Sequence, residues 1–239
     1  MKNKIIIFCF ILMLIGTYTY IQGSSASSKE INLVALGDSI THGSGDPSRQ
    51  GYIEIVRGKL EEKKGIPVQV SNYAIPKYTS DDILEQLQDE EILEQLNKAT
   101  YMVLYIGTND FRKSTDHKFN PLNKKMLITE RLTFSNNMHK VLKIMKRENP
   151  TAPIFVLGLF HPYVEFQNQQ EILSLIEQWN SEIIDIINNF ERTLYVPTLD
   201  LFKDKPKKLY FSDSLHPNPA GYQLIADRLF SHLESTISE

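Results

Sequence analysis

The stretch INLVALGDS at residues 31–39 decides the fold that the sequence predicts. Residues 31–36 form a predominantly apolar run, which is typical of a strand buried on both faces of a parallel sheet. Gly37 ends the run, and the polar pair Asp38 and Ser39 follows at once. We therefore expect a buried strand whose carboxyl end leads directly into a polar turn.

Apolar runs and amphipathic stretches alternate along the rest of the chain, with no internal repeat and no long linker. Four further runs predict strands at residues 68–73, 101–106, 153–159 and from 194 to 196. Apolar residues at helical spacing predict helices at residues 52–64, in two short pieces between 80 and 96, and at 130–147, 167–190 and 219–233. We expect Ser80 to cap the first short piece and Leu132 to face the core. Residues 111–127 are polar and irregular, which favours a loop over the functional site.

Strands that alternate with helices favour parallel pairing through right-handed crossover connections. Residues 30–239 are no more than a single α/β domain can contain. The sequence therefore predicts one α/β domain with about five parallel strands. In such sheets ligands bind at the carboxyl ends of the strands.

Residues 1–29 have the layout of a secretory signal peptide. Lys2 and Lys4 give a positive start, and residues 5–15 are wholly apolar. An uncleaved anchor is the alternative, because apolar character continues past Gly16, and a membrane-spanning helix needs about 20 such residues. We expect an extracytoplasmic protein that is secreted or membrane-anchored through this segment, and the sequence leaves cleavage or retention open.

The charge of the chain argues against a nucleic-acid partner. The formal net charge is −3 at pH 7, and without Lys2 and Lys4 it becomes −5, from 24 basic and 29 acidic residues. A mildly acidic domain has no electrostatic footprint for nucleic acid. The only cysteine, Cys9, lies in the N-terminal apolar run, so the domain can form no internal disulfide. Without a cysteine cluster or an HExxH motif, we expect no metal and no cofactor.

Polar residues occur where the predicted strands end. Ser39 follows the first strand, Asn72 ends the second and Asn109 follows the third. Asp213 and His216 stand three residues apart before the last helix. Gly-Asp-Ser alone is often an ordinary turn or a helix cap. Because the carboxyl ends of parallel strands meet at one edge, we expect these residues to converge into a single site.

These residue types are the parts of serine-dependent acyl transfer. A serine hydroxyl is a weak nucleophile unless a base takes its proton during the attack. His216 is the best candidate base because imidazole titrates near neutral pH. Asp213 is close enough in a turn to accept the ring N–H of His216 and fix its tautomer. Ser39, His216 and Asp213 are therefore the candidate catalytic residues.

The reaction also needs hydrogen-bond donors that face the oxyanion of the tetrahedral intermediate, each worth about 3 to 4 kcal/mol. The backbone N–H of Ser39, expected at the mouth of a helix, is one candidate. The side-chain amide of Asn109, directly after Gly107 and Thr108, is the second. We expect a third from the loop after the second strand.

The chain resembles the SGNH hydrolases of the GDSL esterase/lipase family between residues 31 and 233. Gly37-Asp38-Ser39-Ile40 is similar to the first family block, Gly107-Thr108-Asn109-Asp110 to the third, and Asp213-Ser214-Leu215-His216-Pro217-Asn218 with Gly221 to the last. The resemblance implies a flavodoxin-like, three-layer α/β/α sandwich with helices on both faces. It also implies a shallow, solvent-open site and metal-free hydrolysis of acyl esters.

The second block departs from the family pattern Asn-x-Gly-x-x-Gly. In Asn72-Tyr73-Ala74-Ile75-Pro76-Lys77, alanine and lysine stand at the glycine positions. The resemblance implies that Lys77 supplies the third oxyanion donor through its backbone N–H. Lysine lacks glycine's conformational freedom, so its side chain must also find room.

The sequence thus predicts an exported, serine-dependent hydrolase that cleaves carboxylic (acyl) esters through an acyl-enzyme, of the lipase or esterase type. Its partner is a small-molecule or lipid ester, with membrane association through the N-terminal segment where that is retained. Two alternatives use the same fold. One is a carbohydrate O-acyltransferase or deacetylase, and the other is a catalytically weak surface binding module. Chain length of the acyl group, substrate identity and oligomeric state stay open.

Overall fold

The computed structural model describes residues 30–115, 118–119 and 121–237; the predicted N-terminal targeting segment, residues 1–29, lies outside them. One sheet contains β1 (Ile31–Gly37), β2 (Val68–Asn72), β3 (Tyr101–Tyr105), β4 (Ile154–Leu157) and β5 (Thr193–Val196). Its order is β2-β1-β3-β4-β5, and every neighbouring pair is parallel. The predicted α/β fold with about five parallel strands is confirmed.

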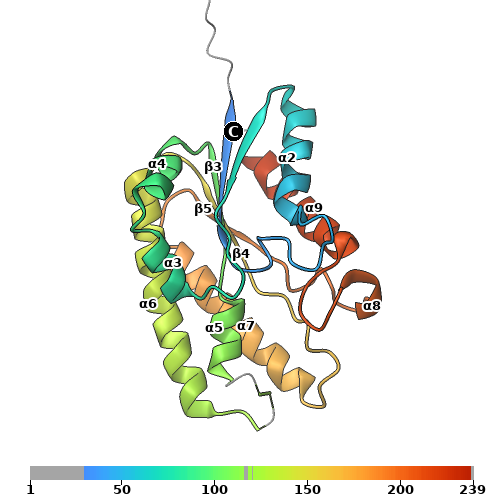
Figure 1. Ribbon diagram of the computed structural model, residues 1–239. Coiled ribbons are helices and arrows are strands. Elements are labelled where there is room, and N and C mark those ends of the chain that lie inside the picture. Colours follow the sequence, from blue (N-terminus) through green and yellow to red (C-terminus); the bar gives the residue numbers. More distant parts are fainter. Residues whose placement is uncertain (1–29, 116–117, 120, 238–239) are drawn as a thin grey trace, which may run out of the picture. The chain divides into compact units, whose positions relative to one another are not determined.

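Helices cover both faces of this sheet, as Figure 1 shows. They are α2 (Gly51–Lys64), α3 (Ser80–Gln86), α4 (Glu90–Lys98), α5 (Thr108–Ser114), α6 (Lys124–Glu148), α7 (Gln169–Ile187), α8 (Lys207–Tyr210) and α9 (Pro219–Ile237). α2 packs beside α9 on one face, whereas α6 packs against α3, α4, α5 and α7 on the other. The expected three-layer sandwich is therefore confirmed.

The apolar runs form the strands because both faces of the sheet are covered. Leu33, Ala35 and Leu36 of β1 are fully buried, and so are Met102 to Tyr105 of β3 and Ile154 and Phe155 of β4. A strand with one face in water would alternate apolar and polar residues instead. Continuous burial thus explains why these strands are the easiest elements to find in the sequence.

Local signals set the ends of two helices. Gly65 ends α2 in the left-handed conformation, with φ of 64°, and its N–H donates to the carbonyl of Glu61 at 2.8 Å. Asn123 caps α6, because its side-chain oxygen accepts the N–H of Met126 at 3.2 Å.

The predicted loop at residues 111–127 is wrong at both ends, because α5 reaches Ser114 and α6 already begins at Lys124. Phe111 is buried on α5, and its ring packs edge-on against Trp179 with centroids 5.6 Å apart. Short helices owe most of their stability to such tertiary packing. The sequence of α5, a polar segment of seven residues, gives little indication of this packing.

Two further expectations are wrong. The side chain of Leu132 is 59% exposed, whereas Phe134, two residues on, is fully buried. Ser80 does not cap α3; it is the first residue of that helix, and its hydroxyl donates to the carboxylate of Asp110 at 2.5 Å. Thr79 occupies the cap position, and its N–H donates to Asp82 at 2.7 Å.

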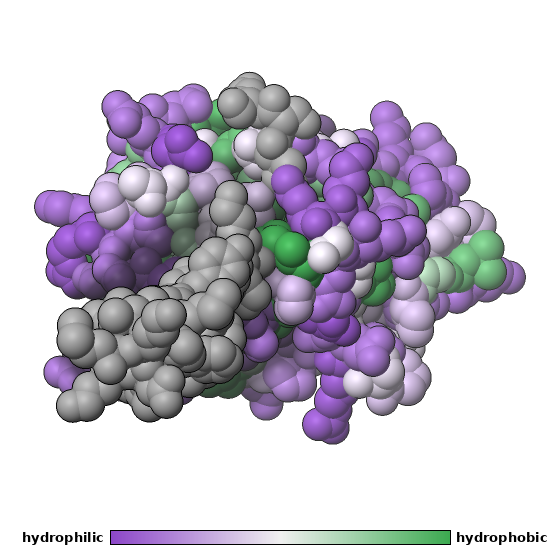
Figure 2. Space-filling view, turned by 90° about the horizontal axis from the view of Figure 1, so that it is seen from above, coloured by the Kyte–Doolittle hydropathy of each residue, from purple (hydrophilic) through white to green (hydrophobic). Residues whose placement is uncertain are grey.

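Figure 2 looks down on the end of the molecule where β1 begins. Outside the grey region, hydrophilic residues predominate there, and hydrophobic residues form only small, separate patches. No helix within the described residues is long and apolar enough to cross a bilayer. The polar residues of the predicted site follow the opposite, carboxyl ends of the strands.

Candidate active site

Ser39 lies in a series of turns after β1, and not at the mouth of a helix as expected. The N–H of Ser44 donates to the carbonyl of Ser39 at 2.9 Å, but α2 begins only at Gly51. Gly43 and Gly45 have φ of 86° and 92°, which a right-handed helix cannot contain. The turns leave Ser39 only 6% exposed at the carboxyl edge of the sheet.

Three predicted catalytic side chains are in hydrogen-bond contact. Nε2 of His216 lies 3.0 Å from Oγ of Ser39, and Nδ1 of His216 lies 2.7 Å from Oδ2 of Asp213. The nucleophile and the base are 177 positions apart in sequence. The arrangement allows the imidazole to accept the serine proton at Nε2 while its other nitrogen stays bonded to the carboxylate.

Asp213 is built to stay ionised. Its Oδ1 accepts the backbone N–H groups of Leu215 and His216, each at 2.7 Å. Partial burial acts to raise the pKa of Asp213, but the backbone N–H and the imidazole of His216, together with the Leu215 N–H, outweigh it and lower that pKa. A carboxylate that remains charged can stabilise an imidazolium beside it.

Gly45 is a part of the site that the sequence reasoning missed. A Cβ at Gly45 would lie 2.8 Å from Cβ of His216 and 2.5 Å from the carbonyl oxygen of Pro217. The hydroxyl of Ser212 also donates to the carbonyl of Gly45. The two glycines shortly after the Gly-Asp-Ser motif were the available signal, since they let the nucleophile loop approach the loop of the base.

Asn109 lies in the first turn of α5, directly after the positive-φ residue Gly107 and Thr108. Its Nδ2 donates to the carbonyl of Tyr78 at 2.9 Å and lies 3.5 Å from Oδ2 of Asp38. The second contact is long, so one amide hydrogen is weakly held. The amide is thus fixed between the loops that follow β1 and β2.

Lys77 adopts the conformation that favours glycine. Its φ is 74°, and its side chain is exposed to solvent. Within the described part of the chain, the backbone N–H groups of Lys77 and Ser39 donate to no protein acceptor. Both N–H groups are therefore available to a ligand. A left-handed lysine carries a conformational cost of about 1–2 kcal/mol.

Asn72 has a supporting role at the end of β2. Its Nδ2 donates to the carbonyl of Thr41 at 2.9 Å, and its Oδ1 accepts the N–H of Ala74 at 3.1 Å. These bonds join the loop after β1 to the loop after β2, so Asn72 helps to hold Lys77 beside the nucleophile loop.

Asp38 is a fully buried carboxyl next to the nucleophile. Its Oδ1 accepts the N–H of Ile40 at 2.9 Å. Burial raises the pKa of Asp38 to about 7. The hydrogen bonds of Ile40 and Thr108 lower this pKa, and the charge of Asp110 raises it further. The carboxyl thus stabilises the turn around Ser39, but its desolvation costs free energy of folding.

A cavity of about 960 Å³ lies between α7, β5 and the segment after β5, and its lining includes His161, Tyr195 and Arg228 but none of Ser39, Asp213 and His216. Among the residues that the structure describes, no three His, Cys, Asp or Glu side chains gather as they would around a metal ion.

A family model and curated relatives match most of this chain. The model of the GDSL-like lipase/acylhydrolase family matches residues 35–224. The uncharacterized protein YpmR of Bacillus subtilis is 27% identical over 98% of this chain and 97% of its own length.

Two solved structures share the fold. The lipase Lip_vut3 from a goat rumen metagenome has a TM-score of 0.72 at 22% identity, covering 84% of this chain and 96% of its own. The acetylxylan esterase Axe2 of Geobacillus stearothermophilus has a TM-score of 0.64 at 21% identity, covering 84% and 93%.

Strain at Lys77 can be measured by comparing Lys77→Gly with Lys77→Ala. Both variants remove the long side chain, but only glycine adopts positive φ freely. We expect Lys77→Gly to have a free energy of unfolding about 1 kcal/mol higher than Lys77→Ala, measured by urea denaturation. An alanine variant as stable as the glycine variant would show that the lysine backbone is not strained.

The burial of Asp38 predicts a pH dependence of stability. Its carboxyl keeps a proton up to about pH 7 in the folded protein, but only to about pH 4 when unfolded. Between these values the folded state binds more protons, so the free energy of unfolding falls as pH rises, by at most about 1.4 kcal/mol per pH unit. Asp38→Asn should therefore reduce this downward slope between pH 4 and pH 7, measured by urea denaturation, while the raised pKa of Asp110, about 6, keeps part of it.

Asp200→Asn is the control of opposite sign. The hydrogen bond from Arg228 lowers the pKa of Asp200, so this group adds stability above its unfolded pKa and loses it as pH falls. Asp200→Asn should leave the downward slope between pH 4 and pH 7 in place. Parallel curves for Asp38→Asn and the wild type would contradict the role given to Asp38.

Proposed function

Because the chain belongs to the GDSL-like lipase/acylhydrolase family, we propose that it is a carboxylic ester hydrolase that works through a serine-bound acyl-enzyme. The observation that carries the proposal is the contact of Nε2 of His216 with Oγ of Ser39 at 3.0 Å, with Asp213 bonded to the other ring nitrogen. A hydroxyl in this position can lose its proton to the imidazole as it attacks.

In the proposed first half-reaction, Oγ of Ser39 forms a bond to the carbonyl carbon of the ester, and its proton passes to Nε2 of His216. Asp213 stabilises the imidazolium through Nδ1. When the tetrahedral intermediate collapses, its bond to the alcohol oxygen breaks, and His216 returns the proton to the leaving alcohol. The acyl group then remains on Ser39 as an ester.

The second half-reaction uses the same groups with water in place of the alcohol. His216 takes a proton from water, whose oxygen attacks the acyl carbon, and then gives that proton to Oγ of Ser39 as the acid leaves. The backbone N–H groups of Ser39 and Lys77 and the amide of Asn109 are the proposed donors to the oxyanion. Support comes from the free N–H groups of Ser39 and Lys77 and from the second amide hydrogen of Asn109, which makes only the long 3.5 Å contact with Asp38.

An open site favours soluble or surface-presented esters over a deeply enclosed acyl chain. The Asp213 side chain is 53% exposed and that of His216 24%. Lip_vut3 is named a lipase and Axe2 an acetylxylan esterase, so lipid esters and acetylated sugars are both candidate substrates. Acyl transfer to a sugar would use the same residues with a sugar hydroxyl in place of water.

The proposal is tested with p-nitrophenyl esters of increasing acyl chain length. We expect the wild type to hydrolyse them and Ser39→Ala to lose roughly 10³-fold or more in kcat, because the acyl-enzyme cannot form. A fluorophosphonate should label the wild type and leave Ser39→Ala unlabelled. Equal hydrolysis rates for the two proteins would overturn the proposal, and a wild type without labelling would favour the binding-module alternative.

We also propose that residues 1–29 direct the chain across the cytoplasmic membrane, on the basis of the Lys2 and Lys4 charges followed by the apolar residues 5–15. Fractionation of cells that express the full chain should recover it outside the cytoplasm, whereas a chain starting at residue 30 should stay inside. The mass of the exported protein tells cleavage from retention. Cytoplasmic recovery of the full chain would contradict export.

A further inference from the structure

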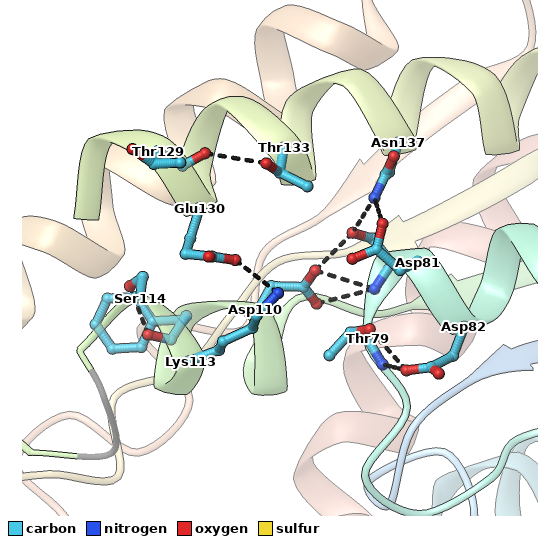
Figure 3. Close-up of polar contacts among 12 residues, drawn as sticks. Thr79, Asp81, Asp82, Asp110, Lys113, Ser114, Thr129, Glu130, Thr133 and Asn137 are labelled. Atoms are coloured by element: carbon cyan, nitrogen blue, oxygen red, sulfur yellow. Dashed lines mark hydrogen bonds and ion pairs between the residues drawn. The ribbon is translucent and has the colours of Figure 1, made fainter. Parts of the chain in front are cut away.

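A buried polar cluster lies behind the proposed oxyanion site and takes no part in the chemistry described above. It consists of the buried residues Ser80, Asp110 and Asn137 together with Asp81, which is exposed, and we call it the Asp110 cluster. Ser80 and Asp81 begin α3, Asp110 lies in the first turn of α5, and Asn137 comes from the middle of α6. Figure 3 shows Asp110 and Asn137 directed toward the start of α3 from these two helices. Ser80, Asp110 and Asn137 are 0%, 5% and 5% exposed.

The hydrogen bonds of the Asp110 cluster run in one direction. Nδ2 of Asn137 donates to Oγ of Ser80 at 3.1 Å and to Oδ1 of Asp81 at 2.7 Å. The Ser80 hydroxyl then donates to Oδ1 of Asp110 at 2.5 Å, and the Ser80 N–H lies 3.0 and 3.1 Å from its two oxygens. Because Asn137 donates to the Ser80 oxygen, the Ser80 hydrogen is directed at Asp110. The carboxylate of Asp110 thereby fixes Ser80 through two separate groups.

This cluster is joined to the oxyanion donors through the backbone. Asn109 precedes Asp110, and its amide donates to the carbonyl of Tyr78 at 2.9 Å. Tyr78 lies between Lys77 and the start of α3, where Asp110 holds Ser80. Asn109 and Asp110, neighbours on α5, therefore hold the segment after Lys77 by hydrogen bonds at two positions, Tyr78 and Ser80. The position of the Lys77 N–H relative to the Asn109 amide depends on both sets of hydrogen bonds.

We propose that Asn137 is a positioning residue for this esterase, which acts through Ser80 and Asp110 to set the spacing between the Asn109 amide and the Lys77 N–H. The inference rests on the proposed function, in which those two groups bind the oxyanion. Burial raises the pKa of Asp110 to about 6, and the Ser80 hydrogen bonds oppose that shift. An uncharged amide at Asn137 supplies donors to this buried region without adding a charge.

Oxyanion donors act on the transition state more than on the bound ester, so their displacement should lower kcat with little change in KM. Asn137→Leu keeps much of the side-chain volume and removes both donated bonds. We expect its kcat to fall about 10- to 100-fold with KM within about threefold of the wild type, which is less than the roughly 10²- to 10³-fold loss on removing a donor itself.

Ser80→Ala is the second variant, since it removes the relayed hydroxyl bond but keeps the Ser80 N–H on Asp110. Combined with Asn137→Leu, it should give a loss in kcat smaller than the product of the two single losses, because both changes break one chain of contacts. This variant keeps the test usable if Asn137→Leu does not fold, which thermal unfolding of each variant would show.

Glu130→Gln is the matched control. Glu130 on α6 pairs with Lys113 on α5 at 3.0 Å (Figure 3), so its loss weakens a contact of α6 with α5 but leaves the hydrogen bonds of Asn137 to α3 in place. Its kcat and KM should equal those of the wild type. An active wild type with unchanged kcat in Asn137→Leu or Ser80→Ala would overturn the inference and leave the proposed function standing. A wild type that hydrolyses no ester would overturn the proposed function, and the inference with it.

Discussion

The parallel pairing of β1 with β2 on one side and β3 on the other is the constraint on which the site depends. Ala35 of β1 pairs with Asn72, and Gly37 pairs with Tyr105. The loops after these three strands therefore leave the same edge of the sheet side by side. Ser39, Lys77 and Asn109 follow the ends of those strands within five residues, Asn109 in the first turn of α5. Central placement of β1 puts the nucleophile between the two loops that carry the proposed oxyanion donors.

A second set of contacts brings the base to this edge from the other end of the chain. The Tyr222 hydroxyl of α9 donates to the carbonyl of Ser44 at 2.6 Å, and the Ser212 hydroxyl donates to that of Gly45. These bonds join the nucleophile loop to both flanks of the turn that carries His216. Since a side chain at Gly45 would collide with His216, the close approach needs glycine there. The separation of 177 positions is thus bridged by backbone acceptors as well as by the catalytic contact.

The sequence predicts the elements and residues that depend on short-range patterns, and it fails for helix ends and side-chain burial that depend on contacts between distant residues. Buried parallel strands are continuous apolar runs, so their positions are predicted within two or three residues, and the Asp213–His216 spacing makes that pair visible. Phe111 is placed wrongly because α5 is stabilised by packing on Trp179, and Ser80 because its partner Asp110 is 30 positions away. Leu132 is exposed although its residue type favours burial, since only the rotation of α6 against its neighbours decides which positions face the core.

In both the Gly-Asp-Ser motif and the Gly-Thr-Asn-Asp motif, a residue of the proposed active site has a buried carboxyl next to it in sequence. Asp38 adjoins Ser39 and accepts from Ile40 and, at longer range, from Asn109; Asp110 adjoins Asn109 and accepts from Ser80. Burial makes both carboxyls costly, as their raised pKa values of about 7 and about 6 record. Hydrophobic residues at those positions would avoid the cost but could not accept N–H groups from neighbouring loops. The Asp38 and Asp110 carboxyls therefore lower the stability of the fold but fix the positions of the loops relative to one another. Oxyanion donors depend on such fixed positions, because they stabilise the transition state only when they are already in place.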